Sequence, residues 1–377
     1  MRRVSLEFVE PGMKVGRTIF NTEGRPLLVS GMVLNENYIQ RLRDYGIGSV
    51  MIKDDMFDEI EEPPDVVSEQ TRLESVRTVK EVFKTFENKR RIDLRGIQKT
   101  VNNLIDELLS NREILVNFID IRSYDDYTFC HSVQVCVLAL MTGISLGFDQ
   151  LKLKELGTGA LVHDIGKTKI DKEILNKPGE LTPEEYEQIK RHSEYGFEIL
   201  RANREISLLS AHVAFQHHEH WDGKGYPRGL SGEEIHHYSK IVTVADVFDA
   251  LVADRPYRKA YSTNQAITLM RRMAGVHFEP FILETLISNI AEFPIGSVVA
   301  LSSGEIGVVV DSNKEVPTKP VVRVVFNKRW KPLTHMREVD LTKELGINIS
   351  RTLSEEEVQS LFKDLLPLKQ PRNNQPA

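Results

Sequence analysis

Between residues 66 and 253, apolar side chains recur three or four positions apart, the spacing of one face of an α-helix. A further helix is predicted to begin at Thr182, because this threonine can cap it, Pro183 suits its first turn, and Glu185 completes a capping box. The middle of the chain is therefore predicted to be a helical bundle. The clearest helical stretches are 66–87, 93–110, 112–146, 207–216 and 238–253.

The two ends of the chain show a different pattern. Residues 1–60 contain short β-type runs around one helical stretch and predict a small α+β domain. This domain could be a regulatory or oligomerisation module, or a plain folding appendage. Residues 61–110 begin with an acidic, proline-rich linker and continue with helices. Residues 293–350 hold three valine-rich runs separated by turns and predict a small antiparallel β unit. We expect residues 351–377 to form a short helix and a disordered tail.

Composition narrows the class of protein. Of the 377 residues, 41% are hydrophobic and 28% are charged, which is typical of soluble globular proteins, and the net charge of −6 argues against wholesale electrostatic binding of nucleic acid or anionic membranes. The first residues lack the apolar core of a signal peptide, and no run approaches the roughly 20 apolar residues that span a bilayer. The two cysteines, Cys130 and Cys136, form no disulfide framework. We expect a cytoplasmic protein without DNA, RNA or membrane insertion.

Residue types that bind metals interrupt the predicted helices. His131 lies on an apolar stripe, His192 falls on the inner face of the helix that begins at Thr182, and Asp246 lies within an apolar helix, where an unpaired carboxylate is costly to bury. Each histidine alone would more often be a hydrogen-bonded core residue. One polynuclear metal site explains all of them together, and nitrogen and oxygen ligands without thiolates suit iron, manganese or zinc. Four further candidates stand toward helix ends: His163 and Asp164, in a helix predicted to end near Gly166, and His217 and His218.

Further motifs follow these candidates along the chain. Lys167 comes shortly after His163-Asp164, residues 222–227 read Asp-Gly-Lys-Gly-Tyr-Pro, and residues 255–258 read Arg-Pro-Tyr-Arg. The whole series resembles the HD-GYP family, bacterial phosphodiesterases of the HD superfamily that hydrolyse cyclic di-GMP. The resemblance covers about residues 110–292 and implies a mainly α fold, with an HD-type helical bundle as the catalytic domain over residues 111–292. The N-terminal region resembles, more weakly, a small domain that precedes some members.

The resemblance also implies roles for individual residues. Asp164 would bridge two ions, with a hydroxide between the ions as the nucleophile, and Lys167 would contact phosphate or assist the leaving group. Cyclic di-GMP would be opened to linear pGpG, with cleavage to GMP as a further step. Iron or manganese is favoured over zinc, nickel, magnesium or cobalt. The implied metal ligands are His131, His163, Asp164, His192, His217, His218 and Asp246. The implied substrate contacts are Lys167, Gly225, Tyr226, Pro227, Arg255 and Arg258.

The sequence departs from the family pattern at one position. Some members carry a glutamate four residues before the first histidine, where it helps to hold a third metal, and here that residue is Tyr127. A phenol with an unperturbed pKa of about 10 is neutral at pH 7 and a poor ligand compared with a carboxylate. Asp126 lies about 100° round the helix from it. We therefore expect a dinuclear site, with a third ion as the alternative.

Other functions remain open at this point. The same site could hydrolyse another cyclic dinucleotide or a nucleotide, and the domain could instead be a non-catalytic module that senses cyclic di-GMP. A di-iron oxidoreductase would use similar ligands, but Lys167 and the two downstream arginines favour phosphate. A homodimer or a signalling protein as partner, and the input signal, are left open by the sequence.

Overall fold

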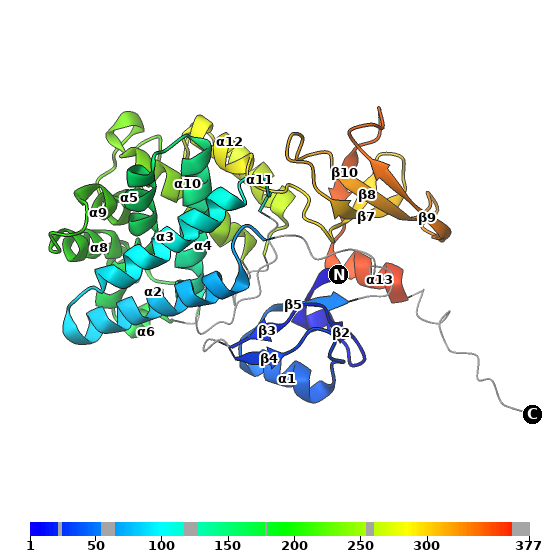
Figure 1. Ribbon diagram of the computed structural model, residues 1–377, viewed down its shortest axis with the longest axis horizontal. Helices are drawn as coiled ribbons and strands as arrows, with labels where there is room; N and C mark the ends of the chain where they lie inside the picture. The colour runs from blue at the N-terminus through cyan, green and yellow to red at the C-terminus, as the bar shows by residue number, and fades with distance from the viewer. Residues whose placement is uncertain (22–24, 54–64, 117–126, 178, 254–259, 364–377) are drawn as a thin grey trace, which may run out of the picture. The chain divides into compact units, whose positions relative to one another are not determined.

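The chain folds into two compact units, each described here by itself. In the computed structural model, the helical unit comprises residues 21–25 and 64–290, and the other unit joins residues 1–20 and 26–63 to residues 291–377 (Figure 1). The structure describes residues 1–21, 25–53, 65–116, 127–177, 179–253 and 260–363.

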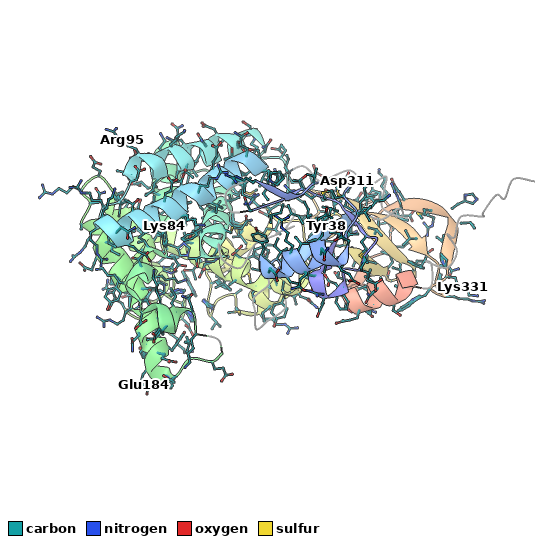
Figure 2. All side chains as sticks on the ribbon, turned by 90° about the horizontal axis from the view of Figure 1, so that it is seen from below. Tyr38, Lys84, Arg95, Glu184, Asp311 and Lys331 are labelled. Atoms are coloured by element: carbon teal, nitrogen blue, oxygen red, sulfur yellow. The ribbon has the colours of Figure 1, made fainter. Side chains whose placement is uncertain are left out.

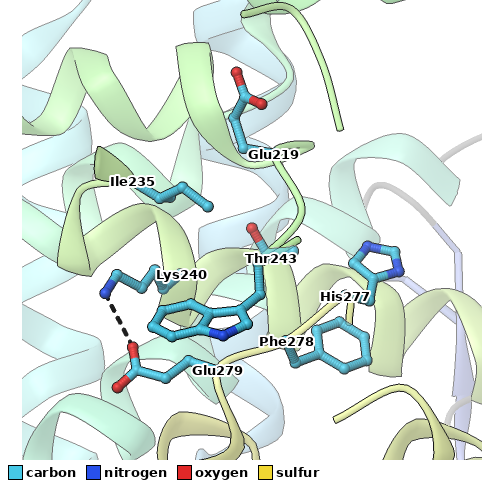
Figure 3. Close-up of a pocket in the computed structure, with 8 residues that line it drawn as sticks. Glu219, Ile235, Lys240, Thr243, His277, Phe278 and Glu279 are labelled. Atoms are coloured by element: carbon cyan, nitrogen blue, oxygen red, sulfur yellow. Dashed lines mark ion pairs between the residues drawn. The ribbon is translucent and has the colours of Figure 1, made fainter. Parts of the chain in front are cut away.

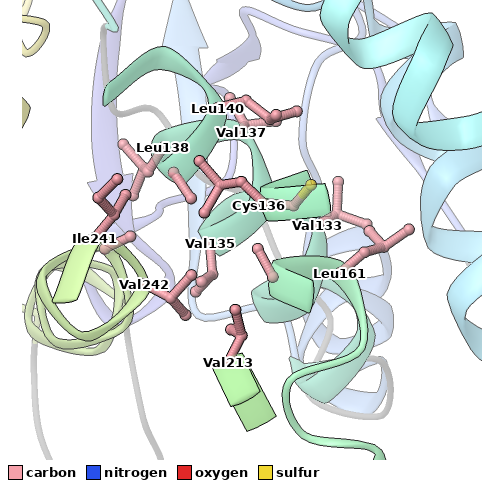
Figure 4. Close-up of a cluster of buried hydrophobic side chains, with 14 of the residues drawn as sticks. Val133, Val135, Cys136, Val137, Leu138, Leu140, Leu161, Val213, Ile241 and Val242 are labelled. Atoms are coloured by element: carbon pink, nitrogen blue, oxygen red, sulfur yellow. The ribbon is translucent and has the colours of Figure 1, made fainter. Parts of the chain in front are cut away.

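The helical unit is built around α4 (Tyr127–Ser145), which packs against α2, α3, α5, α10 and α12. Figure 4 shows α4 side chains such as Val135 and Leu138 meeting Val213 of α9 and Val242 of α10. Residues Thr128–Ser145 are apolar enough to cross a membrane, but 72% of this stretch is buried, as in a core helix. The other elements are α2 (Glu69–Lys89), α3 (Leu94–Ser110), α5 (Gln150–Leu161), η4 (Ile165–Lys169), α6 (Lys172–Leu175), α7 (Pro183–Lys190), α8 (His192–Arg201), α9 (Leu208–Gln216), η5 (Gly232–Glu234), α10 (His237–Val252), α11 (Thr263–Arg272) and α12 (Pro280–Ile287).

The helices α2 and α3 belong to this unit. Their apolar faces, with residues such as Val79 and Leu104, share one continuous core with α4 and α5. Their polar faces extend outward, as the labelled Lys84 and Arg95 show in Figure 2. The helices predicted within residues 61–110 therefore pack directly on the helices that follow, and the helical unit extends beyond residues 111–292.

Three predicted helix boundaries are wrong. Residues 112–116 are not helical, because Val116 donates its backbone N–H to the Asn289 carbonyl (2.9 Å) and pairs with Ile290 in a β-bridge. The helix capped by Thr182 has the expected capping box, but it ends at Lys190 and α8 begins anew. Similarly, α5 ends before the His163-Asp164 pair. Apolar spacing continues across such breaks, so periodicity does not reveal them.

The N-terminal part of the other unit is a small α+β arrangement. It contains a three-stranded antiparallel sheet in the order β1-β5-β2, a β3-β4 hairpin, and α1. Asn35 caps α1 by accepting the Tyr38 backbone N–H (2.9 Å), and the helix buries Ile39 and Leu42. The elements are β1 (Arg2–Ser5), η1 (Leu6–Phe8), β2 (Lys14–Val15), β3 (Ile19–Phe20), β4 (Pro26–Leu28), α1 (Glu36–Asp44) and β5 (Ser49–Lys53).

The C-terminal part is a five-stranded antiparallel sheet in the order β10-β6-β7-β8-β9. Alternation along the strands places Val298 and Val308 on the face that packs with Val358 of α13, and Val299 and Val309 on the other face. The edge strand β9 was not predicted, because most of its side chains are exposed and no apolar alternation marks it. The mainly α fold class with a β-rich C-terminal extension is confirmed. The elements are β6 (Val298–Leu301), β7 (Ile306–Asp311), β8 (Val321–Phe326), β9 (Pro332–Asp340), β10 (Ile349–Thr352) and α13 (Glu355–Lys363).

Candidate metal centre

The His163-Asp164 pair lies in the turn between α5 and η4, and a close backbone approach holds this turn against α8. A Cβ atom on Gly166 would lie 1.9 Å from the carbonyl oxygen of His192 and 2.5 Å from the backbone nitrogen of Gly196. Only glycine permits this contact. The approach brings Asp164 Oδ1 to 3.5 Å from Nε2 of His192, the first residue of α8.

Six of the predicted metal ligands gather into two groups, which are buried apart from the partly exposed His218. Two aspartates face histidines of both groups. The Asp164 carboxylate lies 3.5 Å from His163 Nε2 and 3.9 Å from His217 Nε2. Asp246 lies 3.0 Å from His131 Nε2 and 3.9 Å from His218 Nδ1. In each group the ligating atoms lie within 4.8 Å of one another, and the groups are His131, His163 and Asp164, and His192, His217 and His218.

Backbone carbonyls orient three of these histidines. An imidazole whose Nδ1–H donates to a carbonyl keeps its Nε2 lone pair for a metal, as in most protein metal sites. In all three rings, Nε2 then points toward the shared carboxylate of Asp164. The donor–acceptor pairs are His163 Nδ1 to Ala160 O (2.8 Å), His192 Nδ1 to Ile189 O (2.6 Å) and His217 Nδ1 to Ala214 O (3.0 Å).

The nitrogen atoms that face the centre fit divalent cations. His163 Nε2 is buried and has no hydrogen-bond partner among the described residues. His192 Nε2 and His217 Nε2 lie 3.3 Å apart, so two lone pairs face each other when both Nδ1 atoms are protonated. A cation between such atoms satisfies both lone pairs. The donor set of imidazole nitrogens and carboxylate oxygens, without thiolates, suits iron, manganese or zinc.

Most of these histidines are held in the neutral form, which is the form that binds a metal. Burial lowers the pKa of His192 to about 4 and that of His218 to about 3, so both rings are uncharged at neutral pH. His131 differs, because hydrogen bonds to Asp246 and Asp249 outweigh the effect of burial and raise its pKa to about 9. Metal binding at His131 therefore exchanges a proton for the ion.

The pKa of Asp164 is strongly perturbed. Burial alone would raise its pKa, but the Lys167 ammonium and the neighbouring histidines hold the pKa well below the usual range. The Lys167 ammonium donates a hydrogen bond to Asp164 Oδ2. The carboxylate is therefore ionised at neutral pH and can bind cations.

Comparison with known proteins agrees with this geometry. A family model described as "HD domain" matches residues 115–282, and one described as "KOW domain associated with HD domain" matches residues 298–361. The chain is 36% identical over 244 residues to the cyclic di-GMP phosphodiesterase PA4108 of Pseudomonas aeruginosa, a match that covers 64% of this chain and 59% of the relative. The chain belongs to the HD-GYP family.

Two further relatives and one solved structure are similar to this chain. A cyclic di-GMP phosphodiesterase of Thermotoga maritima is 38% identical over 51% of this chain and 53% of the relative. The 3'3'-cGAMP-specific phosphodiesterase 2 of Vibrio cholerae is 34% identical over 67% of this chain and 47% of the relative. The chain thus spans about half the length of these relatives. The structure of Bd1817, an HDG"Y"P protein from Bdellovibrio bacteriovorus, matches the fold with a TM-score of 0.50 at 18% identity, over 75% of this chain and 97% of that chain.

In this HD-GYP domain, Asp249 is a candidate site residue that the sequence analysis missed. Its side chain is fully buried on α10, and Oδ2 lies 2.6 Å from Nδ1 of His131. A carboxylate behind a metal-binding histidine sets the tautomer and orientation of the ring. The available signal was a second aspartate, three residues after Asp246, in an otherwise apolar helix.

The Gly-Tyr-Pro loop of the HD-GYP domain folds back onto the segment that carries His218. A Cβ atom on Gly225 would lie 2.3 Å from the backbone nitrogen of His220, so glycine is required there. Tyr226 donates its backbone N–H to the His218 carbonyl (3.0 Å), and its ring stacks on the His218 ring with centroids 4.7 Å apart. The structure therefore brings Lys167 and the Gly225-Tyr226-Pro227 loop to the centre. Arg255 and Arg258 lie outside the described residues.

A second missed residue, Glu219, secures the far end of this loop. Its carboxylate is buried and accepts the backbone N–H groups of Arg228 (2.8 Å) and Leu230 (2.9 Å). Because Glu219 directly follows His218, one segment supplies both a candidate metal ligand and the anchor of the loop. The sequence signal was an acid between two histidines, and no role was predicted for it.

The near end of the loop is secured at a small pocket next to Glu219 (Figure 3). Lys240 is buried there, with its ammonium 3.1 Å from Glu279 Oε2 and 4.8 Å from the centre of the Trp221 ring. Trp221 also donates its backbone N–H to the His277 carbonyl (3.0 Å). The loop is thus held at both ends, which fixes the Tyr226 ring against His218.

Replacing Glu219 by glutamine is expected to loosen the loop without removing metal. The amide oxygen of glutamine can accept one of the two buried N–H groups, and leaving the other unpaired costs about 1–3 kcal/mol. Hydrogen–deuterium exchange at the Arg228 and Leu230 amides should therefore speed up, with metal content unchanged. The control is Glu205→Gln, an exposed carboxylate in another part of the helical unit. Equal exchange in wild type and Glu219→Gln would contradict the anchoring role.

Proposed function

We propose that this protein is a metal-dependent phosphodiesterase that hydrolyses cyclic di-GMP to linear pGpG, with GMP as a further product. The observation that carries the proposal is the pair of ionised carboxylates, Asp164 and Asp246, set between two groups of histidines with the Lys167 cation alongside. The relatives from Pseudomonas and Thermotoga are named cyclic di-GMP phosphodiesterases, which supports cyclic di-GMP as the substrate. We place this activity in the cytoplasm, without DNA or RNA as a partner.

Different residues of the chain would have different roles in the hydrolysis. When bound, two divalent ions activate a water molecule and neutralise the charge that develops on the phosphodiester. Asp164 and Asp246 would hold ions together with the five histidines, and Asp249 would keep His131 in its ligating orientation. Attack of the water oxygen on phosphorus breaks the bond to the ribose 3′-oxygen, which must gain a proton. Lys167, whose ammonium donates a hydrogen bond to Asp164, would bind a phosphate oxygen or supply that proton.

The identity and number of the ions belong to the proposal. We favour iron or manganese over zinc, nickel, magnesium or cobalt, as the family resemblance implies, and the imidazole and carboxylate ligands are compatible with that choice. We favour two ions because the sequence has Tyr127 where some relatives have a glutamate. We also propose a homodimer or a signalling protein as partner.

A mixed cyclic dinucleotide is the second candidate substrate. Two relatives of this chain from Vibrio cholerae, 34% and 40% identical over their matched regions, are named 3'3'-cGAMP-specific phosphodiesterases. The intact set of seven ligands argues against a module that only senses a nucleotide.

The deciding experiment combines metal analysis of anaerobically purified protein with turnover of cyclic di-GMP and 3'3'-cGAMP by the same sample. We expect about two ions per chain and hydrolysis of cyclic di-GMP at the lower KM. If 3'3'-cGAMP is hydrolysed faster than cyclic di-GMP at equal concentration, the mixed cyclic dinucleotide is the substrate instead. Metal-loaded protein that cleaves neither nucleotide would refute the proposed function.

Arg255→Ala and Arg258→Ala are expected to lower kcat/KM by about 10-fold or more, because a hydrogen bond to a charged group contributes about 1.5–3 kcal/mol. Metal content should stay at the wild-type level, since guanidinium groups do not bind metal ions. The measurements are steady-state kinetics with cyclic di-GMP and metal analysis of each variant. Loss of metal from either variant would mark the arginine as structural instead.

A further inference from the structure

Lys190, the last residue of α7, holds its ammonium group between two tyrosine rings. The Nζ atom lies 4.8 Å from the centre of the Tyr186 ring and 5.6 Å from the centre of the Tyr226 ring. Its side chain is 27% exposed, so the cation is partly desolvated but open to solvent. Cation–π contacts of this kind restrict a flexible lysine to one place.

This cation stands next to the candidate metal centre. The Tyr226 ring, over which Lys190 lies, stacks on His218 and meets His192 edge-on, with centroids 4.7 Å and 6.5 Å away. Only Arg191 separates Lys190 from His192 in the chain. One aromatic ring therefore lies between the Lys190 ammonium and the histidines that face the centre.

The ion pair that Lys190 makes in the free protein is easily exchanged. Its Nζ lies 2.6 Å from Glu187 Oε1, and the Glu187 side chain is 68% exposed. Such exposed pairs three residues apart on a helix contribute little to stability. An anionic phosphate group of a ligand can therefore replace the Glu187 carboxylate as the partner of the Lys190 ammonium.

A cyclic dinucleotide carries two phosphodiester groups, and the metal centre with Lys167 can engage only the one that is cleaved. We propose that Lys190, held by Tyr186 and Tyr226, binds the second phosphodiester of the cyclic dinucleotide, the one that stays intact. This inference rests on the proposed function. It explains how the same site would favour cyclic dinucleotides over substrates with one phosphodiester. A substrate with a single phosphodiester cannot reach both cations at once.

The test compares two substrates on metal-loaded, full-length protein. For Lys190→Ala we expect KM for cyclic di-GMP to rise about 10-fold or more, the effect of losing one charge-assisted contact, and kcat to change little. Hydrolysis of bis(p-nitrophenyl) phosphate, which has one phosphodiester, should stay at the wild-type rate, and so should metal content. Lys190→Arg, which keeps the charge, should restore most of the affinity.

Two further variants serve as matched controls. Lys169 also lies over a tyrosine, with Nζ 5.4 Å from the centre of the Tyr195 ring, so Lys169→Ala removes an equivalent contact away from Tyr226 and should leave both substrates unaffected. Glu187→Gln removes the competing carboxylate and should leave KM for cyclic di-GMP unchanged or lower.

Specific outcomes would overturn the assignment. An unchanged KM for cyclic di-GMP in Lys190→Ala, or equal losses on both substrates, would show that Lys190 does not recognise the second phosphodiester. If wild-type protein cleaves bis(p-nitrophenyl) phosphate but no cyclic dinucleotide, the proposed function fails. In that case, the affinity of wild type and of Lys190→Ala for cyclic di-GMP is measured by calorimetry. Weaker binding by Lys190→Ala would support the role of Lys190, and equal or absent binding would refute it.

Discussion

Replacing Asp164 by alanine should remove most of the bound metal and lower phosphodiester hydrolysis by a factor on the order of 10³ or more, equivalent to several kcal/mol of transition-state stabilisation. The Asp164 carboxylate lies within 3.9 Å of histidine nitrogens from both ligand groups, including His163 and His217. Alanine leaves both groups without their shared anion. The measurements are metal per chain and kcat for cyclic di-GMP.

Two companion variants sharpen this result. His163→Ala removes the one Nε2 atom that is buried without a hydrogen-bond partner among the described residues, and should lower metal content and activity in parallel. Asp171→Ala removes an exposed aspartate that caps α6, and should leave metal content unchanged. Wild-type activity in both Asp164→Ala and His163→Ala would end the metal-hydrolase assignment.

Gly166→Ala should destabilise the helical unit and weaken its hold on metal, although Gly166 binds nothing itself. The added methyl carbon would overlap the backbone of His192, so η4 and α8 must move apart. Such overpacking costs about 1–3 kcal/mol or more, and each kcal/mol lowers the thermal midpoint of a domain of this size by about 2–4 °C. Because the same approach joins Asp164 to His192, metal should be lost on dialysis more rapidly than from wild type.

The control for this variant lies in the same interface. A Cβ atom on Gly196 would meet the Ala214 methyl at 3.1 Å, a tight contact that small shifts can relieve. Gly196→Ala should therefore lower the thermal midpoint less than Gly166→Ala and retain metal. If Gly166→Ala melts and binds metal as wild type does, backbone approach does not organise the centre.

Much of this protein could be predicted from local pattern. Polar residues that interrupt apolar helices, such as His131 and Asp246, are costly to bury alone, and so the sequence pointed to a shared metal site. The Thr182 capping box and the valine-rich strands depend on contacts between near neighbours in the chain, and both are confirmed. The roles of Arg255 and Arg258 stay predictions.

Only the tertiary structure revealed one helix boundary and the contacts of several polar side chains. The break between α7 and α8, which makes His192 a helix start, leaves no mark in the apolar spacing. The buried Asp249 gains its role only because α10 packs against α4, and Lys190 gains its place only because the loop of Tyr226 folds back over His218. The physical reason is that apolar periodicity reports which face of an element is buried. The partner of a polar atom is set by contacts between elements far apart in the chain.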